Sequence, residues 1–356
     1  MDTTGYRNRM EIAWKNVRAN RSVRPADMIN GYRMIHPLRS LDRPHESFDL
    51  MKLAMELFTR LEVTYQPLAT SPAPCTPGNN IARHHHTNQP RVGLFVDAPD
   101  HLSGVALTLG EWADQARSSG CPLTIHSCGT APAKPGMISF QPMGTIQLDA
   151  YAGLQLHVPR VDEVLRYIDR MAFDVIHVST PGPMGLLGLL AARHRGLPVC
   201  GTYHTDFPRY AGVLSGNPAM EEVGWKFMRW FYGQLDRVAA PTESIRRELV
   251  EHGFDPAKLT VVGRGVNTSE FTPALRSEKL RSAWGERYPL VLMYVGRISR
   301  EKNLEVLVQA MQRLCPSRPD ICLVVVGEGP YREEMEQSLV SCPVFFTGTL
   351  KGRSPL

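Results

Sequence analysis

The stretch that decides the fold is Leu290–Leu304, LVLMYVGRISREKNL, in which an apolar run passes through a glycine into a basic loop. Leu290–Val295 has the length and apolar character of a buried strand, and Asn303–Leu314 has the spacing of a helix. The intervening loop, Gly296–Lys302, therefore connects a strand to a helix, as in a parallel α/β sheet.

This loop has the features of a diphosphate site. The N-terminus of a helix offers backbone N–H groups and the positive end of a dipole to an anion. Arg297 adds a fork of N–H donors that matches phosphate oxygens, and Lys302 adds a point charge. An exposed basic turn between a strand and a helix has the same composition, and the stretch alone does not separate these two interpretations.

The alternation of strand and helix begins at Arg91 and continues along the chain. It predicts parallel sheets covered by helices, with ligands at the carboxyl ends of the strands. Before Gly265 the expected strands are Val92–Val96, Leu123–His126, Asp174–Val178, Pro198–Thr202, Arg237–Ala240 and Leu259–Val262, and the expected helices are Gly104–Arg117, Arg160–Met171, Met184–Arg195 and Thr242–His252. After it, strands are expected at Leu290–Val295, Ile321–Val326 and Val344–Phe346, and helices at Asn303–Leu314 and Tyr331–Leu339.

This pattern divides the chain into four parts. Residues 1–65 are expected to form a helical leader of unknown role, and residues 66–90 a linker rich in Pro, Asn and His. Residues 91–264 and 265–356 are expected to form two doubly wound, Rossmann-like domains. Because three strands are too few for a stable doubly wound domain, the second is predicted to be incomplete.

Composition and charge exclude several classes of protein. With 43% hydrophobic and 21% charged residues, the chain is neither disordered nor fibrous. No run approaches the roughly 18 apolar residues that span a bilayer, and Met1–Asn20 lacks the apolar core of a secretory signal. A cytoplasmic protein, at most peripheral to a membrane, is expected. Most of the net charge of +5 lies in residues 1–90, with 12 Lys/Arg against 8 Asp/Glu, and no specific nucleic-acid partner is expected.

No metal site is expected. The seven cysteines form neither a C-x-x-C pair nor a zinc-ligand spacing, and their number is odd, which indicates reduced, buried thiols. His84–His86 lie in the Pro/Asn-rich linker without nearby cysteines or carboxylates, so they are interpreted as exposed residues rather than ligands.

Several motifs stand in order around the loop. They are HVSTPGPMGLLG (177–188), GTYHTDFPRYA (201–211), PTESIRREL (241–249), VVGRGVNTSEF (261–271), VGRISREKN (295–303), LVVVGEGP (323–330) and FFTGTL (345–350). In their order and spacing, over residues 91–350, the chain resembles glycosyltransferase family 4. The branch it resembles most contains mannosyl- and sulfoquinovosyltransferases acting on lipid or lipid-like acceptors.

The resemblance implies a GT-B fold and assigns residues to the site. It places Gly296, Arg297 and Lys302 at the donor diphosphate, together with Gly104, although Ser103 stands where the family has Asn or Gly. It places Gly265 and Gly329 in the donor cleft, with Asn267 in place of the usual Asp after Gly265.

The catalytic assignments are His204 and Asp206, which the resemblance places in the cleft beside the transferred sugar or its acceptor. A lone histidine after a strand is more often a structural hydrogen-bonding residue. Asp206 either orients His204 or an acceptor hydroxyl, or caps the next turn.

The implied reaction moves a hexose-type sugar from a nucleotide diphospho-sugar to a lipid or glycan acceptor with retention of configuration, without a cofactor or metal. Family members carry an E-x7-E pair beyond the motifs found here, and Glu328 and Glu333–Glu336 do not replace it, which again predicts a truncated donor domain. A non-catalytic fragment or binding remnant and a nucleotide-sugar epimerase on the same scaffold are the alternatives.

Two weaker signals also have a structural and a functional interpretation. The aromatic stretch Met220–Leu235 either packs inside the first domain, which is favoured, or contacts a membrane or lipid acceptor. Gly263-Arg264-Gly265 and Gly327-Glu328-Gly329 lack the third glycine of a dinucleotide fingerprint, with Thr268 and Arg332 in its place, so dinucleotide binding is not expected.

Overall fold

The computed structural model describes residues 89–97, 104–129, 136–148, 154–279 and 287–350. The predicted leader, nearly all of the predicted linker with its three histidines, the loop 98–103 and residues 351–356 lie outside these ranges. The chain divides into two units, Met1–Asp206 with Val223–Gly263 and Phe207–Glu222 with Arg264–Leu356. The domain limits expected from the sequence stay predictions.

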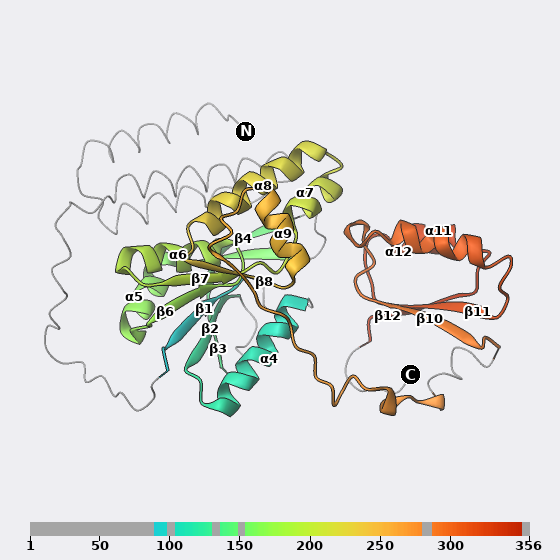
Figure 1. The fold of residues 1–356 in the computed structure, drawn as a ribbon, viewed down its shortest axis with the longest axis horizontal. Helices are drawn as coiled ribbons and strands as arrows, with labels where there is room; N and C mark the ends of the chain where they lie inside the picture. The colour runs from blue at the N-terminus through green and yellow to red at the C-terminus, as the bar shows by residue number, and fades with distance from the viewer. Residues whose placement is uncertain (1–88, 98–103, 130–135, 149–153, 280–286, 351–356) are drawn as a thin grey trace, which may run out of the picture. The chain divides into compact units, whose positions relative to one another are not determined.

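The first unit is built on a parallel seven-stranded sheet with the strand order β3-β2-β1-β6-β7-β8-β9 (Figure 1). The chain adds strands on one side of β1 and then, from β6, on the other, so the topological switch point lies between β1 and β6. The strands are β1 (Val92–Phe95), β2 (Leu123–Cys128), β3 (Met137–Phe140), β6 (Val175–Val178), β7 (Val199–Thr202), β8 (Arg237–Ala240) and β9 (Leu259–Val261).

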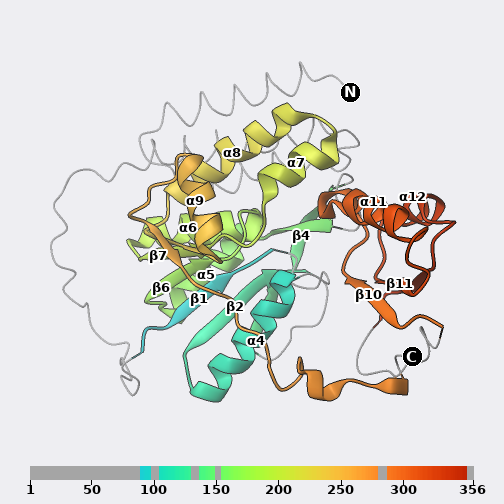
Figure 2. The same cartoon turned by 45° about the vertical axis from the view of Figure 1, so that its right-hand side comes forward.

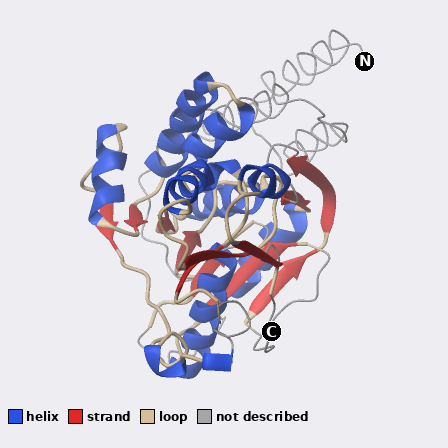
Figure 3. Ribbon diagram, turned by 90° about the vertical axis from the view of Figure 1, so that its right-hand side faces the viewer, coloured by secondary structure: helices blue, strands red, loops and turns tan. Residues whose placement is uncertain are grey.

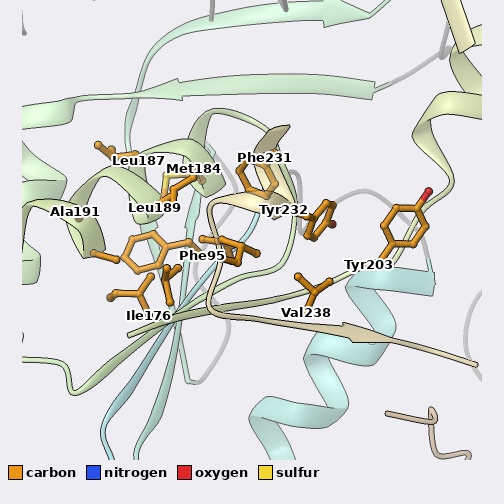
Figure 4. Close-up of a cluster of buried hydrophobic side chains, with 14 of the residues drawn as sticks. Phe95, Ile176, Met184, Leu187, Leu189, Ala191, Tyr203, Phe231, Tyr232 and Val238 are labelled. Atoms are coloured by element: carbon orange, nitrogen blue, oxygen red, sulfur yellow. The ribbon is translucent and has the colours of Figure 1, made fainter. Parts of the chain in front are cut away.

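Helices cover both faces of this sheet, as a fully buried parallel sheet requires. Leu94 and Val96 share a core with Leu109 and Ala113 of one helix. Phe95 faces the opposite core, which includes Ile176 and Met184 (Figure 4). The helices of this unit are α4 (Gly104–Ser119), α5 (Val161–Met171), α6 (Pro183–Arg195), α8 (Pro218–Gly233), which begins in the second unit, and α9 (Glu243–Glu251).

The predicted ends of α9 are confirmed in detail. Thr242 precedes the helix in an extended conformation, and its Oγ1 accepts a hydrogen bond from the Ile245 backbone N–H at 3.2 Å. Gly253 follows the helix with φ at 84°, a left-handed conformation that suits glycine.

The aromatic stretch on α8 packs inside the first unit. Most of its large apolar side chains are almost fully buried in the main core, as Figure 4 shows for Phe231 and Tyr232, and Trp230 is partly buried against it. Trp225 stacks on the His252 ring with 3.6 Å between ring centroids. The structural interpretation of Met220–Leu235 is therefore confirmed, and these aromatic rings are not a membrane surface.

The sequence analysis left the segment between β2 and α5 unassigned. It contains β3 and an antiparallel pair, β4 (Pro142–Leu148) and β5 (Leu154–Pro159), which form a separate two-stranded sheet. Among the described residues, no helix is both long and apolar enough to cross a bilayer.

The second unit contains a three-stranded parallel sheet in the order β10-β11-β12. Figures 2 and 3 show α11 (Leu304–Leu314) and α12 (Arg332–Ser338) over the strands. Leu323 and Val325 of the central strand share a core with Met311 and Met335 of these helices. The elements are α7 (Phe207–Ser215), the 3-10 turns η1 (Pro273–Leu275) and η2 (Arg300–Lys302), β10 (Leu290–Val295), α11 (Leu304–Leu314), β11 (Ile321–Val326), α12 (Arg332–Ser338) and β12 (Val344–Gly348).

The backbone ladder of β10 and β11 continues beyond the strand ends into the loops that follow. The Gly296 N–H donates to the Val326 carbonyl at 3.0 Å, and the Ile298 N–H donates to the Glu328 carbonyl at 2.9 Å. The two loops approach so closely that a Cβ on Gly329 would lie 2.1 Å from the Ile298 carbonyl oxygen, and one on Gly327 would lie 1.9 Å from that of Gly296. Glycine is therefore required at both positions by backbone packing.

We expect Gly329→Ala to destabilise the second unit by about 2 kcal/mol or more, because the added methyl forces the two loops apart. Hydrogen–deuterium exchange of peptides covering β10 and β11 measures the loss as faster exchange. Gly265→Ala is the matched control, since a Cβ there meets no atom within 4 Å. Equal exchange in the two variants would contradict the close-packing argument.

Candidate functional site

The loop Gly296–Lys302 is held rigidly at the end of β10. The Tyr294 hydroxyl folds back and donates to the Arg297 carbonyl oxygen at 2.7 Å. The Tyr331 N–H donates to the Ile298 carbonyl at 3.0 Å, so the loop is fastened from both sides. The Arg297 side chain is 16% exposed, and its Nη1 is buried.

The start of α11 differs from the sequence expectation. Arg300–Lys302 form the separate 3-10 turn η2, Asn303 adopts a left-handed conformation, and α11 begins at Leu304. The N–H groups of Lys302 and Asn303 donate to Ser299 and Arg300 carbonyls within this turn. Two N–H groups expected to face an anion are therefore used inside the loop, and the side-chain cations become more important for any anion bound there.

The cations of the loop have different partners. The Lys302 ammonium donates to the Tyr210 hydroxyl of α7 at 2.9 Å and lies 5.3 Å from the centre of its ring. Arg300 instead pairs with Glu305 and with Glu334, so it links helices α11 and α12. Tyr210 was missed by the sequence analysis, although it lies inside the quoted GTYHTDFPRYA motif.

The catalytic candidates lie in the first unit, just after β7. The His204 ring is 6.1 Å from the Trp112 ring of α4. Asp206 directly precedes α7, and its carboxylate accepts a long hydrogen bond of 3.5 Å from the Tyr203 hydroxyl. Burial, followed by the charge of Asp206, raises the pKa of Tyr203, so its hydroxyl stays a donor.

A second histidine, His177, also lies near the Trp112 ring. His177 of β6 is 6.0 Å from the Trp112 ring, and its Nε2 is 3.0 Å from the Thr202 hydroxyl. Burial lowers the pKa of His177 to about 4, so the ring is neutral at neutral pH. It therefore contributes a hydrogen bond between neighbouring strands rather than a positive charge.

The buried carboxylate of Asp97 lies at the switch point of the first unit, just after β1. It accepts hydrogen bonds from the Thr180 hydroxyl at 2.6 Å and from the Met184 N–H of α6 at 2.8 Å. Burial raises the pKa of Asp97 to about 6, although these hydrogen bonds act against the rise. The N-terminus of α6, a natural anion site, already holds an anion of the protein itself.

Asp97 was not identified as a site residue from the sequence. A signal was present, because Asp97 and Thr180 each follow strands that the alternating pattern placed in one sheet. The order of strands in the sheet, which makes β1 and β6 neighbours, was needed to bring them together.

The remaining assigned residues are distributed over both units. Gly296, Arg297, Lys302 and Gly329 lie together in the second unit, where Gly329 packs against the loop. Gly104 is the first residue of α4 in the first unit, and Gly265 lies near the start of the last segment of the second. Among the described residues, no three His, Cys, Asp or Glu side chains gather as metal ligands would.

Two family models match the chain. Residues 102–270 match the model described as Glycosyltransferase Family 4, and residues 276–352 match Glycosyl transferases group 1. The chain belongs to this glycosyltransferase family. The resemblance predicted from the motifs is confirmed.

Curated relatives of this family member have names that state different transferred sugars. It is 33% identical to a GDP-mannose-dependent alpha-mannosyltransferase of Mycolicibacterium smegmatis, over 54% of this chain and 48% of the relative. It is 30% identical to the sulfoquinovosyl transferase SQD2 of Arabidopsis thaliana, over 57% and 39%. An alpha-monoglucosyldiacylglycerol synthase of Streptococcus pneumoniae is 29% identical over 73% and 62%. The chain thus spans about half the length of these relatives.

Solved structures share the fold. Sucrose-phosphate synthase from Thermosynechococcus elongatus superposes with a TM-score of 0.56 at 18% identity, covering 74% of this chain and 71% of that one. HepE from Anabaena in complex with UDP-glucose gives a TM-score of 0.53 at 15% identity, covering 74% and 70%. These similarities, with the parallel sheets, confirm the predicted α/β fold of the GT-B type.

We expect Asp97→Asn to change how the stability of this family member depends on pH. The pKa of Asp97 is raised in the folded chain, so its contribution is most favourable below about pH 4 and is lost as pH rises through about 6. The loss is about 3 kcal/mol for a shift of this size. Urea unfolding at pH 4, 5, 6 and 7 gives the free energy of unfolding of wild type and variant, and the loss is the change in their difference with pH. The buried histidines affect stability in the opposite direction, but they are present in both proteins and cancel in this difference.

Asp114→Asn is the control for this experiment, because the Asp114 side chain is 71% exposed and should leave the profile of the wild type unchanged. If the Asp97→Asn and wild-type profiles run parallel from pH 4 to 7, Asp97 does not titrate as its burial requires.

Proposed function

We propose that the chain is part of a retaining glycosyltransferase that moves a hexose-type sugar from a nucleotide diphospho-sugar to a lipid or glycan acceptor. The observation that carries the proposal is the fastened loop Gly296–Lys302, which presents Arg297 and Lys302 at the carboxyl end of a parallel strand. The relatives named for GDP-mannose-dependent transfer and for glucosyldiacylglycerol synthesis support a nucleotide-sugar donor and a lipid acceptor.

Within this proposal, the second unit binds the departing diphosphate. Arg297 gives hydrogen bonds to its oxygens and Lys302 neutralises charge that develops as the sugar leaves. Two protein cations serve the purpose that a metal ion serves elsewhere, so we propose transfer without a metal or other cofactor. The anion already bound at the N-terminus of α6 supports this assignment, because Asp97 would repel a phosphate at the switch point of the first unit.

The first unit supplies His204 and Asp206 to the transferred sugar or its acceptor. His204 follows the carboxyl end of β7, the edge of a parallel sheet where ligands bind. Its contact with Trp112 gives the histidine a fixed neighbour. A lipid acceptor would bring the protein to a membrane surface from the cytoplasmic side, without any contribution from the buried aromatic rings of α8.

We expect Arg297→Ala and Lys302→Ala each to weaken binding of UDP or GDP by about 10- to 100-fold, the range of a lost charge-assisted hydrogen bond. Calorimetric titration with both nucleotides measures the change, and transfer by an active preparation should be abolished in both variants. Arg313→Ala is the matched control, since it removes the same charge from an exposed position near the C-terminal end of α11.

Near-normal turnover by either loop variant would contradict the proposed role of the loop. Thermal stabilisation against a panel of UDP- and GDP-sugars separates the alternatives. Stabilisation by none of them favours a non-catalytic remnant, whereas conversion of a donor without any acceptor indicates a nucleotide-sugar epimerase.

A further inference from the structure

Glu301 is a buried carboxylate inside the loop Gly296–Lys302. Its side chain has no exposed surface, and it lies on the 3-10 turn η2 beside the equally buried Ser299. Glutamate is rarely buried in this way, because an ionised carboxylate loses its hydration unless a cation and hydrogen-bond donors replace the water. The position of Glu301 therefore requires an explanation.

The contacts of Glu301 are few. Its Oε1 accepts a hydrogen bond from the Ser299 hydroxyl at 2.5 Å and lies 3.9 Å from the Arg297 Nε. Its Oε2 is buried and makes no hydrogen bond within the described residues. The carboxylate thus has one neutral donor and pairs with the cation of Arg297.

The pairing with Arg297 acts through charge rather than through a hydrogen bond. A separation of 3.9 Å is too long for an N–H···O bond, but at the low effective dielectric of a buried site the attraction between the charges is substantial. Glu301 attracts the guanidinium toward the loop without engaging its Nε–H in a hydrogen bond.

The shape of the loop does not explain the negative charge. Turn η2 is closed by backbone bonds from Lys302 to Ser299 and from Asn303 to Arg300, and the Ser299 hydroxyl needs only an acceptor oxygen, which an amide also provides. Burying a charge for structure alone is often neutral or unfavourable compared with an uncharged side chain of similar volume. The charge is therefore accounted for by what it does to Arg297.

We propose that Glu301 is a positioning residue, whose buried charge holds the Arg297 guanidinium in the orientation that meets the oxygens of a nucleoside diphosphate. The proposal rests on the proposed function of the loop. It goes beyond that function by adding a residue that does not touch the ligand. Glu301 affects ligand binding by holding the Arg297 side chain in one orientation.

The substitution Glu301→Gln tests this proposal because two effects of the lost charge have opposite signs. By charge alone, removing an anion beside the site strengthens the binding of a diphosphate. By positioning, an Arg297 side chain that is no longer held must be ordered on binding, which weakens binding by about 3- to 10-fold. We expect weaker binding of UDP and GDP.

A double-mutant cycle shows whether Glu301 acts through Arg297. Dissociation constants are measured for wild type, Glu301→Gln, Arg297→Ala and the double variant, with whichever of UDP and GDP the wild type binds more tightly. Glu301→Gln should weaken binding in the wild-type background and have no further effect in the Arg297→Ala background. Glu301→Asp, which keeps the charge, should bind more tightly than Glu301→Gln.

Glu305→Gln is the matched control, because it removes the same charge four residues further along, where the carboxylate pairs with Arg300 instead. It should bind the nucleotide at least as tightly as wild type. Hydrogen–deuterium exchange of the β10 and β11 amides shows whether the second unit is folded in each variant. If Glu301→Gln is misfolded, the binding of Glu301→Asp is compared with that of wild type instead.

Binding by folded Glu301→Gln that equals or exceeds wild type would overturn the proposal. Equal weakening in both backgrounds would also overturn it, because Glu301 would then act independently of Arg297. If wild type binds neither nucleotide, or if Arg297→Ala binds as wild type does, the proposed function of the loop fails. In that case the positioning role fails with it.

Discussion

The interaction on which the second unit depends is the backbone ladder that continues past the ends of β10 and β11. Beyond the end of β10, the Gly296 N–H still donates to the Val326 carbonyl at the end of β11, and the Ile298 N–H donates to the Glu328 carbonyl after it. The loop before α11 is therefore an extension of the sheet, and its side chains are placed by backbone hydrogen bonds. A site built on such a loop is arranged before a ligand arrives, which reduces the ordering that binding requires.

The two units deal with charge at their strand ends in opposite ways. In the first, Asp97 supplies a buried anion to the N-terminus of α6 and is held by Thr180. In the second, Arg297 and Lys302 surround the end of β10, and Glu301 balances one of these charges internally. A shared α/β architecture therefore carries a buried anion at one set of strand ends and two cations at the other.

Much of this fold was predictable from the sequence because its strands read as short apolar runs. This holds even for β10, although its Leu290, Met293 and Val295 are exposed. Nearly every predicted strand and helix is present, with ends shifted by one or two residues. The hairpin β4–β5 was not assigned, and the segment Phe207–Ser215 was read only as a motif, although it forms helix α7. The turn η2 was also missed, because the propensities of Arg300–Lys302 do not distinguish a 3-10 turn from the first turn of an α-helix.

The site was less predictable than the fold. Motif order predicted Arg297, Lys302 and His204 as site residues, and these stay predictions. Nothing in the sequence distinguishes the buried Glu301 from the exposed acidic residues of the neighbouring helices. The contact between Tyr210 and Lys302 joins residues 92 positions apart, and the Asp97–Thr180 pair depends on the order of strands in the sheet. Such pairings are set by tertiary structure, which local patterns do not contain.

The second unit is not one continuous stretch of the chain. The chain passes between the units three times, after Asp206, after Glu222 and after Gly263. A fragment that starts at Arg264 would keep Arg297 and Lys302 but would lose Tyr210, the hydroxyl partner of that lysine. The second unit is thus encoded in two separate segments of the gene, and no single cut isolates it intact.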